Sequence, residues 1–373
     1  ISLSGNPNLA SPPPEIVSQG SASIIAWYDS FENEEPDSEL YLKEIKILLV
    51  GEGLAGKTSL LKQLKGLNFS DSESQTHGVN VETLSLQSFP LFKAKRALKN
   101  VKARFWDFGG QEIMHASHQF FLTHRSVYLF VLDSRTDNKK EYWLRHIQKF
   151  GGESPAIVAI NKVDENPSYS LEESSLNKTF PFINNRFVKV SCKTGVGLEQ
   201  LAEMLSETIL QSPLFKTPIS KSWLNIKNKL EEETKAKEYI SRDRFLTICN
   251  EYGEDDKEGQ NTLLNYLNAL GVVLHFPTLP LLDFFILDPH WVTIGIYKII
   301  NSPSIIDGML EFEKLEFILN EEVQKKEEYD PFEERQISYS TSEQQYLISI
   351  MKDFDLLYEY MPGQYLIPNL LPK

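Results

Sequence analysis

Cysteine is nearly absent from the sequence, since 373 residues include only Cys192 and Cys249. Two isolated cysteines provide neither a disulfide framework nor the ligand spacing of a zinc site, which excludes the small disulfide-rich and zinc-finger classes. Such sparse cysteine fits a reducing compartment, so we expect a cytoplasmic protein. Long apolar runs are also missing, and no segment reaches the length that a membrane-spanning helix needs.

Basic residues are the minority among the charged ones. Lysine and arginine number 38 against 52 aspartates and glutamates, which gives a formal net charge of −14. This balance argues against a general binding surface for nucleic acid or for an anionic membrane. Apolar residues make up 41% and charged residues 24%, as in ordinary globular proteins, and the length is enough for two domains.

The most informative stretch is the glycine-containing segment after the apolar run 46–50. That run is rich in Ile, Leu and Val, which indicates a buried parallel strand. Residues Gly51–Thr58 then match G-x-x-x-x-G-K-[ST], the phosphate-binding P-loop, and leucines at helical spacing follow. In such a loop the glycines let the backbone wrap a phosphate, Lys57 reaches the β- and γ-phosphates, and the Thr58 hydroxyl binds Mg²⁺. The alternative is a chance match in a glycine-rich turn, which the strand before the loop and the helix after it disfavour.

Strands and helices alternate over residues 44–212, which predicts an α/β fold with a mostly parallel sheet and helices on both faces. Ligands of such sheets bind at the carboxyl ends of the strands. The predicted strands are 45–50, 79–86, 101–107, 127–132, 156–160 and 186–190, and the predicted helices are 57–65, 139–150 and 197–210.

A polar segment, Trp106–Glu112, follows the third predicted strand. An aspartate at a strand end, here Asp107, can hold Mg²⁺. The Gly110 amide is placed to contact a γ-phosphate, and Gln111 is placed to orient an attacking water. The segment therefore predicts a second element of a nucleotide site.

The motif Asn161-Lys162-Val163-Asp164 follows the fifth predicted strand. The Asp164 carboxylate can accept hydrogen bonds from N1–H and from the exocyclic amine of guanine. Adenine does not offer this pair of donors, so the motif predicts a preference for GTP over ATP. Asn161 can hydrogen-bond the base and brace the loop, while the stem of Lys162 can lie along the base.

Taken together and in this order, the motifs resemble a Ras-like G domain. Within that resemblance, Ser191-Cys192-Lys193 is similar to the loop whose backbone touches guanine, with cysteine in place of the usual alanine. The resemblance also implies that Thr76 closes on Mg²⁺ together with Thr58 and Asp107. The implied nucleotide contacts are Gly51, Gly53, Ala55, Gly56, Lys57, Thr58, Ser59, Gly110, Asn161, Lys162, Asp164, Ser191, Cys192 and Lys193.

Longer segments of the sequence carry a more specific resemblance than the short motifs do. The runs T-H-G-V-N-V from Thr76 and W-D-F-G-G-Q-E-I-M-H-A-S-H-Q-F-F from Trp106, with segments 133–137 and 142–146, resemble the Roc domain of the Roco family. That family has leucine-rich repeats before Roc and a COR domain after it, and dimerises through the second half of COR. The resemblance implies a homodimer for the longer protein and three parts here: a leucine-rich-repeat end and linker at 1–43, Roc at 44–212 and the N-terminal half of COR at 213–373.

The first part, residues 1–43, is open to two interpretations. Leu3–Pro7 and Pro12–Val17 resemble the last turn of a leucine-rich repeat, and Ser21–Tyr28 fits a short helix leading away from it. The alternative is a linker rich in proline and serine.

The second half combines helical patterns with a predicted hairpin. The helices are expected at 220–235, 242–251 and 261–270, and the hairpin at 272–276 and 284–287, which predicts a mainly helical, winged-helix-like α+β unit. Many such folds bind DNA, but the loop 251–258 is rich in Glu and Asp and would repel phosphates. We therefore expect no nucleic-acid partner, and we interpret His290 as a helix-entry or interface residue.

The activity that follows from these motifs is hydrolysis of GTP to GDP and phosphate, with an intramolecular Roc–COR contact that responds to the nucleotide. No arginine finger is evident. Arg135 is the candidate for one acting across a dimer, and the alternative is a surface arginine paired with Asp133 or Asp137. Two other functions stay open: a nucleotide-dependent scaffold with negligible hydrolysis, which Gln111 disfavours, and a P-loop ATPase, which Asp164 disfavours.

Overall fold

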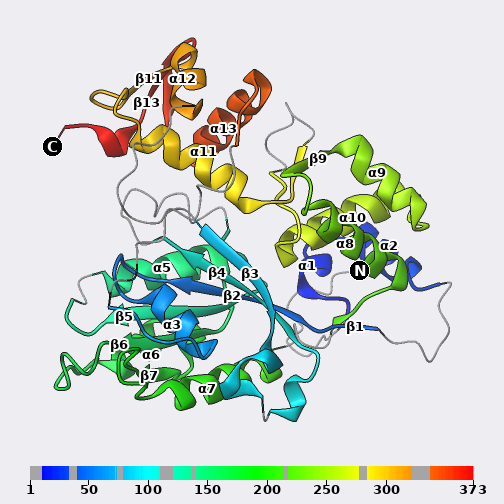
Figure 1. Cartoon of the computed structure of the whole chain (residues 1–373). Coiled ribbons are helices and arrows are strands. Elements are labelled where there is room, and N and C mark those ends of the chain that lie inside the picture. The colour runs from blue at the N-terminus through cyan, green and yellow to red at the C-terminus, as the bar shows by residue number, and fades with distance from the viewer. Residues whose placement is uncertain are drawn as a thin grey trace.

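The computed structural model describes residues 11–32, 40–71, 73, 79–93, 95–109, 121–136, 139–212, 217–276, 284–320 and 337–372. They form an α/β domain built on a central sheet, a helical unit beside that sheet, and a further unit next to the sheet that carries the C-terminus (Figure 1).

Among the described residues, the central sheet has six strands in the order β3-β4-β2-β5-β6-β7. β3 runs antiparallel to β4, and every other neighbouring pair is parallel. The mostly parallel sheet expected from the sequence is therefore confirmed. The strands are β2 (Glu44–Val50), β3 (Val79–Ser85), β4 (Lys102–Phe108), β5 (Val127–Asp133), β6 (Ala156–Asn161) and β7 (Phe187–Lys189).

Helices cover both faces of this sheet (Figure 1). α3 (Lys57–Leu64) and α7 (Leu198–Gln211) pack on one face, α5 (Lys140–Gly151) lies on the other, and α6 (Glu173–Thr179) precedes β7. The apolar core on the α5 face is continuous with the C-terminal unit, because it holds Trp106 of β4 as well as Trp291. The sheet and the second half of the chain thus share one core.

The helical unit contains α8 (Lys221–Glu233), α9 (Arg242–Glu251), α10 (Lys257–Leu270) and two short strands, β9 (Tyr239–Ser241) and β10 (Phe284–Ile286). The predicted hairpin is wrong in its first strand. β10 pairs with β9, and 272–276 contributes only a bridge from Leu274 to Ile286. α10 begins before position 261 because the Asp256 carboxylate accepts a hydrogen bond from the Gly259 N–H at 2.8 Å and caps the helix.

Charged side chains join this unit to the sheet. The Lys227 ammonium of α8 is fully buried and lies 2.8 Å from a Glu44 carboxylate oxygen and 2.9 Å from Glu231. Arg104 of β4 also pairs with Glu231 and donates to the Gly271 carbonyl at 2.6 Å. Burial alone would raise the pKa of Glu231, but Lys227 and Arg104 outweigh it and the pKa is lowered. The two parts of the chain are therefore held together by a mutually neutralising charge cluster.

The N-terminal segment packs against the helical unit. It contains α1 (Pro14–Val17) and α2 (Ser21–Asp29), so the predicted helix at 21–28 is confirmed, and α2 lies along α10. Arg125 of the sheet domain donates to the Glu15 carboxylate at 2.9 Å. β1 (Tyr41–Leu42) pairs with β8 (Thr217–Pro218). The predicted repeat residues Leu3–Pro7 lie outside the described residues, so the leucine-rich-repeat origin stays a prediction.

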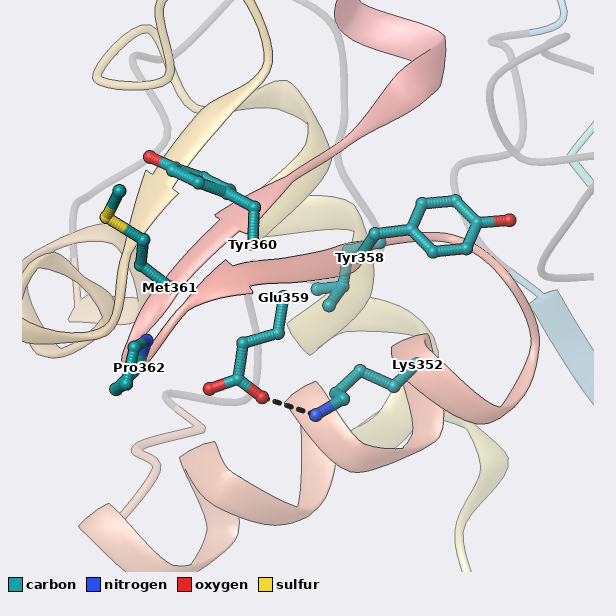
Figure 2. Close-up of a pocket in the computed structure, with 7 residues that line it drawn as sticks. Lys352, Tyr358, Glu359, Tyr360, Met361 and Pro362 are labelled. Carbon is teal, nitrogen blue, oxygen red and sulfur yellow. Dashed lines mark hydrogen bonds and ion pairs between the residues drawn. The ribbon is translucent and has the colours of Figure 1, made fainter.

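In the described part of the C-terminal unit, three α-helices accompany a small antiparallel sheet in the order β11-β13-β12. Asp288 caps the first helix by accepting from the His290 N–H at 3.0 Å, so the helix-entry interpretation of His290 is confirmed. Figure 2 shows a shallow hollow beside β12, where Glu359 pairs with Lys352 of α13. The elements are α11 (Pro289–Asn301), β11 (Met309–Glu311), α12 (Leu315–Asn320), α13 (Thr341–Asp353), β12 (Tyr358–Met361) and β13 (Gln364–Leu366).

Within the described ranges, none of the helices combines the length and the apolar character that crossing a membrane would require.

Candidate functional site

The loop Gly51–Gly56 connects β2 to α3 at the carboxyl end of the sheet. At two of the glycines in this loop, any other residue type would clash with a neighbouring strand or loop. A side chain at Gly51 would place its Cβ 2.2 Å from the Val131 carbonyl oxygen, and one at Gly56 would lie 2.4 Å from the Asn161 amide nitrogen. Both residues also have positive φ, at 143° and 91°. The predicted strand–loop–helix context of the P-loop motif is therefore confirmed.

Lys57 folds back over this loop. Its ammonium donates to the carbonyl oxygens of Gly51 and Glu52, both at 2.8 Å, and the residue is only 5% exposed. Burial lowers the pKa of Lys57 to about 8, although the nearby carboxylates of Asp107 and Glu52 oppose that shift. A buried cation held by main-chain oxygens at a ring of loop amides is suited to bind an anion.

Thr58 and Asp107 meet beside the loop. The Thr58 hydroxyl donates to Asp107 Oδ2 at 2.6 Å. The second carboxylate oxygen, Oδ1, is buried and has no hydrogen-bond partner among the described residues. Burial raises the pKa of Asp107 to about 6, and the Thr58 hydrogen bond opposes the shift. A hydroxyl and a carboxylate with an unused buried oxygen are the donor set that a hard divalent cation prefers, so these residues fit the predicted Mg²⁺ ligands.

Asn161 and Lys162 tie the end of β6 to the phosphate loop. The Asn161 amide donates to the Ala55 carbonyl at 2.9 Å and accepts from the Cys192 N–H at 3.3 Å. The Lys162 ammonium donates to the Leu54 carbonyl at 2.6 Å and to Asp133 Oδ2 at 2.9 Å. Three loops that are far apart in the sequence are thus brought into one site.

Arg135 lies at the edge of the same site. Its guanidinium contacts both oxygens of Asp133 and lies 2.8 Å from Glu165. The hydrogen bonding that Arg135 donates to the Asp133 carboxylate is the main reason why the pKa of Arg135 is raised. The side chain is 43% exposed. This geometry matches the surface-pair interpretation, and a finger role would require Arg135 to leave both carboxylates.

A cavity of about 540 Å³ joins these groups. Asp164 and the phosphate loop both line this cavity, although they are more than 100 positions apart in the sequence. Ser191 does not line it, because this residue is fully buried and its hydroxyl accepts from the Thr194 N–H at 3.1 Å. The lining residues are Glu52, Gly53, Leu54, Gly56, Lys57, Thr58, Ser59, Phe69, Ser70, Asp71, Glu73, Phe108, Arg135, Asn161, Lys162, Asp164, Glu165, Cys192 and Lys193.

Three predicted site residues, Thr76, Gly110 and Gln111, lie outside the described residues. Their roles stay predictions. Two contacts of the site were not expected from the sequence. Asp133 accepts a hydrogen bond from the Lys162 ammonium, and Glu52 of the phosphate loop accepts one from the Trp143 indole N–H at 2.8 Å. The spacing of residues along the sequence does not predict either contact, because each one joins residues from separate elements.

Cysteine 192 is buried at 4% exposure beside Asn161. Burial raises the pKa of its thiol to about 12. The thiol is therefore protonated near neutral pH. The predicted contact of Cys192 with the nucleotide stays a prediction.

Comparisons with known proteins agree with this architecture. The family described as "Ras of Complex, Roc, domain of DAPkinase" matches residues 46–164, and the family described as "C-terminal of Roc, COR-A domain" matches residues 220–371. The structure of Roco2 RocCORdC from Methanosarcina barkeri bound to GDP is similar, with a TM-score of 0.77 and 43% identity. The similarity covers 91% of this chain and 100% of that one.

Curated relatives are longer proteins. The pats1 protein of Dictyostelium discoideum, named as a probable serine/threonine-protein kinase, is 28% identical over 97% of this chain, which spans 12% of that protein. The Roc-COR-CHAT protease of Runella zeae is 30% identical over 70% of this chain, and the match spans 30% of that protein. The chain belongs to the Roco family and carries a Roc domain of Ras-like GTPase type followed by a COR-A domain.

Proposed function

We propose that this chain binds guanine nucleotides and hydrolyses GTP to GDP and phosphate, and that the nucleotide state acts on the COR-A domain. One observation carries the proposal. The phosphate-type residues Lys57 and Thr58 and the base-type residues Asn161 and Asp164 line a single cavity. The GDP bound to the similar Methanosarcina barkeri protein supports the same ligand here.

The base would be recognised by the loop after β6. Asp164 offers a carboxylate to the two donors of guanine, and Asn161 is already fixed by Ala55 and Cys192. The Lys162 stem is held along one side of the cavity by its bonds to Leu54 and Asp133. Cys192 and Lys193 also line the cavity and would contact the base, while the buried Ser191 would support the loop that carries them.

The phosphates would be bound by the loop amides of Gly51–Ser59 and by Lys57. Binding would exchange the two carbonyl partners of Lys57 for phosphate oxygens. Thr58 and Asp107 would hold Mg²⁺, with Thr76 as the third proposed ligand. When bound, the metal would supply positive charge that offsets the charge of the phosphates.

For hydrolysis, Gln111 is the residue proposed to position the water, with the Gly110 amide on the γ-phosphate. The proposal also includes a homodimer of the longer protein, in which Arg135 of one subunit would act as an arginine finger in the site of the other. The competing function is a switch that binds nucleotide and hydrolyses negligibly. The two differ in whether substitution of Gln111 changes the hydrolysis rate.

Nucleotide titrations test the binding part of the proposal. Calorimetry with GDP and ADP should show tight binding of GDP alone. Lys57→Ala should abolish it. Asp164→Asn should weaken GDP binding by about 100-fold, because the acceptor loses its charge and one of its two oxygens is replaced by an amide donor that faces a donor of guanine. Lys221→Ala, at the start of α8 and outside the residues that line the cavity, serves as the control. Equal affinity for ADP, or unchanged GDP affinity in Asp164→Asn, would contradict guanine recognition.

A further inference from the structure

One residue of the phosphate loop is fixed from two sides. The Glu52 side chain accepts the Trp143 indole N–H at 2.8 Å and lies 3.5 Å from the Lys139 ammonium. Its backbone carbonyl accepts from the Lys57 ammonium at 2.8 Å and from the Ala55 N–H at 3.3 Å. The peptide between Glu52 and the glycine that follows it is therefore oriented by contacts on both the side chain and the main chain. The side-chain contacts would remain when Lys57 exchanges its carbonyl partners for phosphate oxygens.

The partner of Glu52 on α5 is a rigid anchor. Trp143 is 2% exposed and belongs to the core on the α5 face of the sheet. That same core contains Trp291 and Ile296 of α11, in the COR-A domain. Because a packed indole cannot follow movements of a surface loop, the hydrogen bond holds the loop to the core rather than the reverse.

We propose that Glu52 and Trp143 are positioning residues for the nucleotide, and that their hydrogen bond slows nucleotide release by keeping the phosphate loop in its binding shape. The inference rests on the proposed nucleotide binding and extends it to residues outside the P-loop motif. Neither side chain needs to touch the nucleotide. Their effect is on the orientation of the amides that would surround the phosphates.

The physical reason lies in the composition of the loop. Gly51, Gly53 and Gly56 give this segment more backbone freedom than any other residue type would, and that freedom is lost when amides converge on an anion. A contact that orders the loop beforehand reduces this entropic cost of binding. It also resists the opening through which a bound phosphate would leave.

The indole contact should carry most of the effect. A hydrogen bond from a buried N–H to a carboxylate is charge-assisted and stronger than a neutral one. The Lys139 contact is longer, and its two side chains are 37% and 30% exposed, so water and salt screen it. Losing the indole bond is therefore expected to accelerate nucleotide release by about tenfold.

The test measures the dissociation rate of a fluorescent GDP analogue from the full chain in excess unlabelled GDP. Trp143→Phe keeps an aromatic ring in the core but removes the N–H, and Glu52→Ala removes the acceptor. Each should raise the rate by about tenfold, and the double variant should be no faster than either single one. Glu52→Gln keeps an acceptor oxygen at the same place and should restore a slow rate. Trp27→Phe is the matched control, since the Trp27 indole N–H has no hydrogen-bond partner among the described residues.

Three results would overturn the proposal: an unchanged rate in both single variants, additive effects in the double variant, or a Gln variant as fast as the Ala variant. A lower unfolding temperature in Trp143→Phe with an unchanged release rate would mean that the residue only supports the core. Should that variant fail to fold, Glu52→Ala and Glu52→Gln decide the matter alone. The outcomes are separable from the proposed function, because a wild-type chain that does not bind the analogue refutes nucleotide binding itself.

Discussion

Arg135 and Asp133 form a two-point contact within one chain, with Nε 3.0 Å from Oδ1 and Nη2 2.9 Å from Oδ2. Asp133 Oδ2 also accepts from Lys162, whose ammonium reaches the Leu54 carbonyl in the phosphate loop. Arg135 is thus connected to the loop after β6 and to the loop Gly51–Gly56 without any second subunit. Burial would raise the pKa of Asp133, but the hydrogen bonds from Arg135 and Lys162 keep it lowered.

This relationship predicts what Arg135→Ala does. Asp133 would lose a two-point partner and hold Lys162 less firmly, so the dissociation constant for GDP should rise by about threefold to tenfold. The effect should be the same at low and high protein concentration, which calorimetry at two concentrations checks. Arg135→Lys keeps the charge without the two-point geometry, so its dissociation constant for GDP should lie between those of the wild type and Arg135→Ala. Normal GDP affinity, with a hydrolysis defect that appears only at high protein concentration, would instead support a finger acting across a dimer.

The charge cluster between the sheet and α8 predicts a stability effect. Lys227→Met would leave Glu44 and Glu231 without their shared cation, in a place where that cation is fully buried. We expect the free energy of unfolding to fall by roughly 2–3 kcal/mol, measured by urea denaturation. Lys229→Met on the same helix is the control, because Lys229 pairs with a Glu232 side chain that is 64% exposed. Equal effects of the two substitutions would show that the buried cluster adds no special stability.

Lys46 predicts a dependence of stability on pH. Its ammonium donates to the Phe121 carbonyl at 2.7 Å and lies over the Trp106 ring. Burial, with a smaller contribution from Arg104, lowers its pKa from 10.5 to about 7. Between these two values the unfolded chain binds a proton that the folded chain has released, so this residue's contribution to stability rises with pH from about 7 to 10 and is constant below that window.

Lys46→Met removes the titrating group and should remove that slope. The difference in unfolding free energy between wild type and variant is expected to shift in favour of the wild type by up to roughly 1 kcal/mol per pH unit. Urea denaturation at pH 7, 8 and 9 measures it. A difference that is the same at all three values would mean that Lys46 titrates normally.

The sequence predicted the central strands β2, β5 and β6 closely, because each is a largely apolar run whose end is marked by glycine, aspartate or asparagine. The predicted 45–50 and 156–160 are found at Glu44–Val50 and Ala156–Asn161. The site loops could be placed for the same reason, since each motif follows such a strand. The short strand β9 had no such signal. β9 has three residues, Tyr239–Ser241, and is defined only by its pairing with β10.

Contacts between distant elements could not be predicted. The bond from Trp143 to Glu52 and the pairing of Lys227 with Glu44 depend on how whole helices pack on the sheet. The pattern of apolar and polar residues within a single helix or strand does not predict such contacts. The start of α10 was placed too late for a different reason, because the acidic segment before it was interpreted as a loop, whereas Asp256 caps the helix.

The central claim is that the chain hydrolyses GTP with Gln111, and single-turnover hydrolysis with Mg²⁺ tests it most directly. The rate should exceed that of Gln111→Leu by at least about tenfold, since positioning of the water is lost in the variant. Repeating the measurement over a wide range of protein concentrations separates a site complete in one chain, with a flat rate, from one completed by a partner. A rate equal to that of Gln111→Leu at every concentration would contradict the claim and leave a nucleotide-binding switch.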